Sequence, residues 1–265
     1  MIEQFSFSEY TFISLIILAV LAFVAGFIDA VVGGGGLIQL PALLIQFPQT
    51  NLPTLFGTNK IAALSGTIIA AIQYAKKVKF NFLLLLTISL FAYLASGAGA
   101  KIVSLLDVKM LKPIILIILI AIAIYTIFKK DLGSIQLKEI SLKKQIIYGS
   151  LIGIVVGFYD GFFGPGTGSF LVLGFVLFLG MDFMHASAYA KIVNCITNLS
   201  ALVVFINQGN YLLNIAVLMG VSNIIGSYLG SHMAIKKGNA FIRNIFIFIV
   251  MLMIIRYGYD VFIKQ

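Results

Sequence analysis

An aspartate followed by a glycine-rich break, inside a long apolar segment, occurs twice in this chain. Residues 25–41 read Ala-Gly-Phe-Ile-Asp-Ala-Val-Val-Gly-Gly-Gly-Gly-Leu-Ile-Gln-Leu-Pro, and residues 156–168 read Val-Gly-Phe-Tyr-Asp-Gly-Phe-Phe-Gly-Pro-Gly-Thr-Gly. Asp160 follows Asp29 by 131 residues, and the same spacing, without a gap, relates Lys191 to Lys60. We infer that one unit is used twice, each copy with the same aspartate, glycine break and lysine.

The composition places these units in a membrane. The chain is 61% hydrophobic and only 10% charged, with a mean hydropathy of +1.09. Apolar runs of about 20 residues, long enough to cross the hydrocarbon core as helices, lie near 12–31, 82–100, 110–128, 146–163, 211–231 and 240–258. They do not alternate apolar and polar residues as strands of a membrane barrel do. We predict an all-α, multi-pass protein of the cell membrane, the inner membrane in a bacterium.

The basic charge fits the same interpretation. The net charge is +9, and most Lys and Arg residues fall in short loops between apolar runs, as the positive-inside bias predicts. We therefore expect the chain to interact with the lipid bilayer and not with nucleic acid. Glu3 and Glu9 precede the first run where a signal peptide would carry basic residues, so this run is expected to remain as a membrane helix. Cys195, the single cysteine, is read as helix packing.

The two copies divide the chain into three parts. Residues 10–130 form repeat one, 131–145 a basic polar linker, and 146–261 repeat two. Each repeat is expected to hold four or five membrane helices. A short helix follows the glycine break, at 37–47 in repeat one and 168–180 in repeat two. A third helix follows at 58–74 in repeat one and 186–206 in repeat two. If the short helices cross fully, five crossings invert the second repeat; four do not. Loop charge, counted over 76–79, 129–144 and 232–243, favours inverted repeats with both termini outside.

Two interpretations stay open for Asp29 and Asp160. A carboxylate at this depth is costly unless it is paired, hydrogen-bonded or wetted. Each could cap amides or neutralise a lysine to hold the broken helix, or it could couple transport to a proton or another cation.

The glycine breaks predict an anion site. Each precedes a short helix, so unpaired amides and the positive end of the helix dipole lie at membrane depth. Broken helices at matching places in two halves point to a binding site between them. We expect positive φ at glycines such as Gly35 and Gly166, where a side chain would also block the anion.

Lys60 and Lys191 enter their third helices at equivalent positions. Each either attracts an anion or extends to the membrane interface. His185 and His232, at expected helix ends, are read as interfacial residues; neither a metal nor a cofactor is predicted.

Several segments together resemble a known family. Gly26 to Pro41, Gly57-Thr-Asn-Lys60, Gly157 to Gly168 and Ala188-Tyr-Ala-Lys-Ile-Val-Asn194 are similar to signature segments of the TauE/SafE sulfite-exporter family of membrane permeases. The resemblance covers nearly the whole chain. It implies transport of sulfite, sulfonates or other small organic anions, and it places the two glycine breaks and both lysines along the anion path. Repeat two departs from an all-glycine break at Pro165 and Thr167, so the two half-sites need not bind alike.

The function expected from the sequence is a secondary anion transporter with alternating access between the two repeats, and not an enzyme. A passive anion channel is the nearest rival, and an intramembrane enzyme is a rival of another class that no catalytic motif supports. The expected partners are a small anionic substrate and a coupling proton or cation. The candidate binding residues are Gly33, Gly34, Gly35, Gly36, Thr58, Asn59, Lys60, Gly164, Pro165, Gly166, Thr167, Gly168, Lys191, Asn194 and Asn198.

Overall fold

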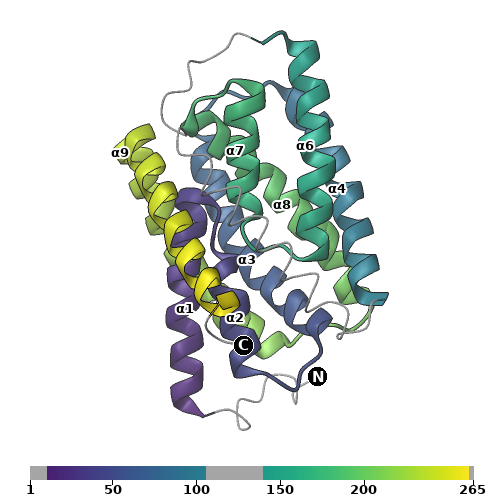
Figure 1. Ribbon diagram of the computed structural model, residues 1–265, viewed down its shortest axis with the longest axis vertical. Coiled ribbons are helices and arrows are strands. Elements are labelled where there is room, and N and C mark those ends of the chain that lie inside the picture. The colour runs from purple at the N-terminus through teal and green to yellow at the C-terminus, as the bar shows by residue number, and fades with distance from the viewer. Residues whose placement is uncertain (1–10, 106–139, 263–265) are drawn as a thin grey trace.

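The computed structural model describes residues 11–105 and 140–262, with side chains up to residue 237. The described residues form helices and no strands (Figure 1). The elements are α1 (Phe12–Val32), α2 (Gly36–Gln46), α3 (Leu52–Ala75), α4 (Phe82–Leu105), α6 (Leu142–Phe162), α7 (Thr167–Leu179), α8 (Phe183–Asn207) and α9 (Leu213–Phe262). The helix expected at 110–128 and most of the linker lie outside the described residues, and the division into two repeats stays a prediction.

Six of these helices are long and apolar enough to cross a membrane: α1, α3, α4, α6, α8 and the part of α9 up to Lys237. α2 and α7 have 11 and 13 residues. At 1.5 Å per residue they measure roughly 16 and 20 Å, too short to cross about 30 Å of hydrocarbon alone. The protein is therefore a multi-pass membrane protein with two short helices.

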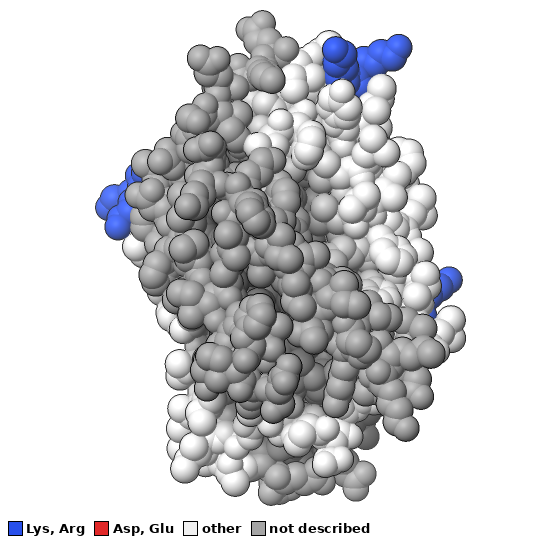
Figure 2. Space-filling view, viewed as in Figure 1, with Lys and Arg blue, Asp and Glu red and all other residues white. Residues whose placement is uncertain are grey.

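The outer surface is suited to lipid. Large apolar side chains are exposed along the long helices, including Phe12, Phe82 and Val155. On the described part of the face shown in Figure 2, basic side chains show only at the rim and no acidic side chain is visible. A surface of this kind matches the hydrocarbon of a bilayer.

Both third helices begin earlier than the sequence predicted, and for the same reason. α3 starts at Leu52 after the cap Asn51, whose side chain accepts from the Thr54 amide, and Pro53 occupies a first-turn position where no N–H is needed. α8 starts at Phe183 after Asp182, which caps the His185 amide. Asn51 and Asp182 are related by the same 131-residue spacing.

One expected loop is not formed. The sequence predicted separate helices at 211–231 and 240–258, joined by a basic loop at 232–243. The backbone is instead helical without interruption from Leu213 to Phe262. The charged residues of this stretch are good helix formers, so polarity alone does not end a helix here.

The helices of the two halves pack against each other reciprocally. α1 packs on α9 and α6 packs on α4, while α3 and α8 meet at the centre. The close contacts use equivalent glycines: a Cβ on Gly26 would lie 2.3 Å from the Asn223 carbonyl oxygen, and one on Gly157 would lie 2.7 Å from that of Ala92. Small residues at such crossings let backbones touch. The contacts thus follow the 131-residue spacing, while the inversion of the repeats stays a prediction.

Candidate functional site

The two glycine loops meet at the centre of the molecule. α1 ends at Val32 and Gly33 follows with φ 87°; a Cβ there would lie 2.2 Å from the Gly168 carbonyl carbon. Ser169 of the second loop donates from its amide to the Gly33 oxygen at 3.2 Å and from its hydroxyl to the Val32 oxygen at 2.9 Å. Only glycine adopts this φ without strain and also leaves room for the other loop.

The positive-φ prediction is correct for Gly166 (φ 86°) and wrong for Gly35, which has φ −58°. Gly33 holds the left-handed position in the first loop instead. Gly35 is needed for another reason, because a Cβ there would lie 2.4 Å from the Ala25 oxygen and 2.7 Å from the Asp29 Cβ. The chain therefore turns back along α1 at this point, and only a residue without a side chain lets it do so.

Two ion pairs join the halves reciprocally. Lys60 Nζ of α3 lies 2.6 Å from Asp160 Oδ2 of α6, and Lys191 Nζ of α8 lies 3.3 Å from Asp29 Oδ2 of α1. Lys191 also donates to the main-chain oxygen of Asp29. The lysine side chains are 4% and 1% exposed, so neither extends to the membrane interface. Each aspartate is thus paired with a lysine, and both interpretations, a structural role and coupling to a proton or cation, stay predictions.

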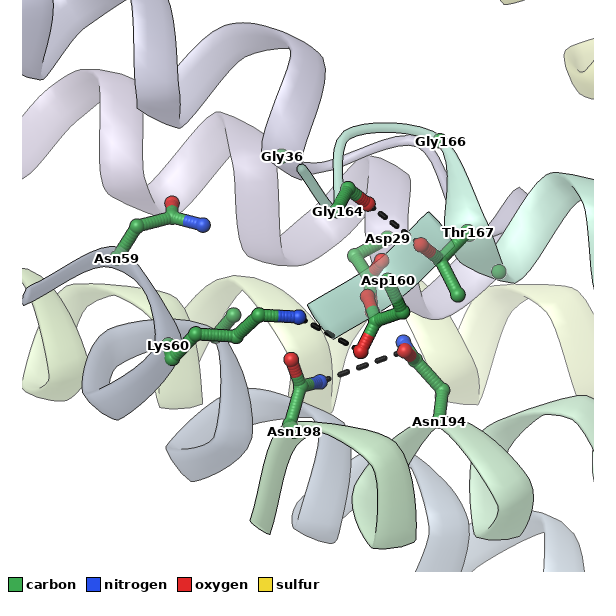
Figure 3. A pocket seen from close by; sticks show the side chains of 13 residues that line it. Asp29, Gly36, Asn59, Lys60, Asp160, Gly164, Gly166, Thr167, Asn194 and Asn198 are labelled. Atoms are coloured by element: carbon green, nitrogen blue, oxygen red, sulfur yellow. Dashed lines mark hydrogen bonds and ion pairs between the residues drawn. The ribbon is translucent and has the colours of Figure 1, made fainter. Parts of the chain in front are cut away.

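A small polar cavity lies between the loops and α3, α6 and α8 (Figure 3). The space open to the centre of a water-sized sphere is about 20 Å³, which has room for about one water molecule. The residues that line it are Asp29, Gly33, Gly36, Asn59, Lys60, Ala63, Asp160, Gly164, Gly166, Thr167, Gly168, Asn194 and Asn198.

The polar groups of the cavity are only partly satisfied. Asn198 donates to Asn194 Oδ1 at 3.4 Å, and Thr167 donates from its hydroxyl to the Gly164 oxygen at 2.6 Å. The side-chain oxygen of Asn59 is buried with no hydrogen-bond partner among the described residues. The N-termini of α2 and α7 have no side-chain cap in the described part of the chain, although the amides of Leu37, Ile38, Thr167 and Ser169 donate to main-chain oxygens. Unpaired buried polar groups are costly, which marks this cavity as a place for a ligand or water.

Five predicted binding residues do not line the cavity: Gly34, Gly35, Thr58, Pro165 and Lys191. Thr58 instead donates to the Thr54 oxygen at 2.7 Å and accepts from the Leu212 amide at 2.9 Å. It thereby holds the start of α9 against α3. Pro165 supports its loop, since its oxygen accepts from the Tyr159 hydroxyl at 2.6 Å.

Sequence reasoning missed Thr67 and Ser169. Thr67 donates from its hydroxyl to Asp29 Oδ2 at 3.2 Å, so it is a further group on that carboxylate. The spacing of 131 residues relates Thr67 to Asn198, a signal that could have identified it. Ser169 makes the contacts between the loops described above, and no equivalent polar residue stands in repeat one to reveal it.

The histidines lie away from this cavity. His185 and His232 are both exposed, and His185 Nδ1 lies 2.6 Å from the Asp182 carboxylate at the start of α8. No cluster of three or more potential metal ligands occurs in the described part of the chain.

The fold and this cavity define a multi-pass membrane protein with a buried polar site between α1, α3, α6 and α8. Residues 18–257 match the family described as "Sulfite exporter TauE/SafE", and the chain belongs to this family. No solved structure matches the chain.

Relatives in several organisms support the same class. The chain is 35% identical over 248 residues to a "Probable membrane transporter protein" of Haemophilus influenzae, covering 93% of this chain and 95% of the relative. It is 35% identical over 250 residues to "Probable membrane transporter protein ORF9" of a Sinorhizobium species, covering 94% of each. It is 31% identical to "Probable membrane transporter protein YfcA" of Escherichia coli K12, covering 96% of this chain and 94% of the relative. The protein is a membrane transporter.

Proposed function

We propose that the protein is a secondary transporter of small anions such as sulfite, sulfonates or related organic anions, and that the anion binds in the cavity between the glycine loops. The observation that carries the proposal is the pair of reciprocal ion pairs beside those loops. They place two buried lysines at the centre of the molecule, where both halves contribute to one site.

The cavity is lined by positively charged and hydrogen-bond-donating groups that could bind an anion. The Lys60 ammonium lies against the second loop, since a Cβ on Gly164 would be 3.2 Å from its Nζ. The N-termini of α2 and α7 also reach the cavity through Gly36 and Thr167, without a side-chain cap on either helix. The positive end of each helix dipole favours negative charge at its N-terminus. Asn59 also lines the cavity, and its side-chain NH2 group would be the donor to a bound anion.

The size of the cavity supports alternating access over a permanently open channel. Sulfite and the sulfonates are larger than one water molecule, so none fits the space of about 20 Å³ without movement of the walls. The loops and helix ends around it belong to different halves, and their separation would open the site. A transporter that closes over its site in this way exposes it to one side at a time.

Uptake by vesicles containing the purified protein tests the proposal. The probes are sulfite, methanesulfonate, sulfoacetate and acetate, each supplied at increasing concentration. We expect saturable uptake of at least one sulfur oxyanion, and faster uptake when the same anion is loaded inside, which is the behaviour of a carrier. Uptake that stays proportional to concentration favours the channel, and no uptake of any probe contradicts anion transport. Lys101→Met, which removes an exposed lysine of α4, is the control for a general loss of charge.

A further inference from the structure

The carboxylate of Asp160 depends on Lys60 alone. Asp160 is 2% exposed, and Lys60 Nζ at 2.6 Å is its one partner among the described residues. Figure 3 marks this ion pair with a dashed line. An anion bound in the cavity would need that same ammonium. Anion and Asp160 therefore compete for Lys60, and only one of them can be paired with it closely.

Asp29 is placed differently. Its side chain is 13% exposed, and it has Lys191 at 3.3 Å and the Thr67 hydroxyl at 3.2 Å. Lys191 does not line the cavity and is fixed by two oxygens of Asp29. An anion in the cavity therefore leaves the Asp29 pair intact while it takes the partner of Asp160. The two equivalent aspartates thus differ in what anion binding does to them.

The charge balance then requires a proton. With both ion pairs formed, the two lysines and two aspartates sum to zero charge. An added anion leaves one buried carboxylate without a counterion, a situation that costs several kcal/mol in a protein interior and is normally relieved by protonation. We propose, building on the proposed function, that Asp160 is the proton-binding site of the transport cycle: one proton binds its carboxylate as the anion takes Lys60, and both leave together.

The surroundings leave Asp160 as the group that takes the proton. It is faced by Lys60 from α3 and, across the cavity, by Asp29 from α1 with its partner Lys191 from α8. α7 has no titratable side chain, and the Lys101 of α4 is exposed. In the balanced step the Lys60 ammonium keeps its charge and exchanges one anionic partner for another, while Asp160 gains a proton from solution and becomes a neutral acid.

The test uses the full chain in vesicles that contain a trapped pH indicator, with a gradient of methanesulfonate, which stays anionic throughout the range of pH used. The wild-type protein should acidify the lumen as methanesulfonate enters, with one proton per anion, and its uptake should not respond to a potassium diffusion potential. If methanesulfonate is not a substrate, the assay uses sulfite at acidic pH, where it is the monoanion hydrogensulfite. It can also use sulfoacetate, a dianion for which one proton per anion should still acidify the lumen but leave uptake responsive to the potential.

Asp160→Asn imitates the protonated acid. This variant should still exchange anions across the membrane, while the accompanying proton movement is lost and net uptake becomes sensitive to the membrane potential. Asp182→Asn makes the same chemical change at an exposed helix cap and should keep the wild-type proton-to-anion ratio. Asp29→Asn should also keep the wild-type ratio of protons to anions, even if its rate of anion uptake is lower.

The outcomes separate the two proposals. Anion uptake by the wild-type protein without proton movement overturns the proton site and leaves anion transport standing. Loss of the proton in Asp29→Asn with retention in Asp160→Asn assigns the proton to the other half and overturns the assignment to Asp160. If no probe anion enters the vesicles, the proposed function fails and the proton site fails with it. If Asp160→Asn does not fold, the wild-type protein and Asp29→Asn still test the assignment: absence of proton movement in the former, or its loss in the latter, overturns it.

Discussion

At the scale of single residues, Lys60 and Lys191 have unequal surroundings despite their equivalent positions in the sequence. Lys60 lines the cavity and reaches Asp160 of the other half. Lys191 lies outside the cavity lining and holds both the carboxylate and the main-chain oxygen of Asp29 at the end of α1. In the proposed mechanism Lys60 binds the anion and Lys191 positions the end of α1.

This difference is testable with charge-balanced double variants. Replacing one lysine alone leaves a buried carboxylate unpaired, which costs about 3–5 kcal/mol and would obscure any effect on binding. Lys60→Met with Asp160→Asn should fold and lose about ten- to a hundredfold in anion affinity, the range expected for one charge-assisted hydrogen bond of about 1.5–3 kcal/mol. Lys191→Met with Asp29→Asn should lose less. Equal affinities in the wild-type protein and the Lys60/Asp160 variant, measured by calorimetry on monodisperse protein, would remove Lys60 from the site.

At the scale of elements, the glycine breaks combine two separate demands on the backbone. Gly33 and Gly166 have positive φ, and Gly33 also touches the other loop. A Cβ on Gly166 would meet its nearest atom, Leu37 Cδ1, only at 3.4 Å. Gly209, between α8 and α9, has φ 70°, and a Cβ added there would have no atom within 4 Å. Substitution of Gly209 or Gly166 therefore tests the cost of positive φ with little crowding, and substitution of Gly33 adds a clash with the backbone of the other segment.

Alanine at each of the three gives a graded prediction. A left-handed alanine costs about 1–2 kcal/mol, so Gly209→Ala and Gly166→Ala should lose similar stability. Gly166→Ala should also weaken anion binding, whereas Gly209→Ala should not, because Gly166 lines the cavity and Gly209 does not. Gly33→Ala should lose the most stability, since its Cβ meets the backbone of Gly168 at 2.2 and 2.4 Å. Melting temperature and affinity are measured on the same preparations; full affinity in Gly166→Ala would make the breaks packing elements only.

The sequence was sufficient to predict the helical membrane class, the short helices after the glycine breaks and most of the cavity residues. Hydrophobicity and the 131-residue spacing depend on composition and order alone, so they are visible in the sequence. The partners of Asp29 and Asp160 were not predictable, because each lysine pairs with the aspartate of the other half and no local pattern encodes that exchange. The uninterrupted α9 was missed because basic residues were taken for a loop although they are good helix formers. The negative φ of Gly35 accompanies its close approach to Ala25 and Asp29 of α1.

At the scale of the whole molecule, helices and charged residues of each predicted repeat contact those of the other reciprocally. The first helix of one half packs on the last described helix of the other, and the ion pairs cross in the same way. If the repeats are inverted, the environments of the two halves exchange when the site changes from one side of the membrane to the other. That exchange is how inverted repeats produce alternating access around a fixed site.

Inversion requires the ends of α3 and α8 to lie on opposite faces of the membrane. Both helices cross, both begin after a short helix, and their C-terminal ends carry the exposed residues Lys77 and Gln208. If the repeats are inverted, as the loop charge predicts, single cysteines Lys77→Cys and Gln208→Cys in a Cys195→Ser background should react with an impermeant thiol reagent from opposite sides of intact cells and inverted vesicles. The Cys195→Ser protein without a new cysteine supplies the unlabelled control. Labelling of both positions from the same side would make the repeats parallel, and the site would then have to open by a movement that does not exchange the two halves.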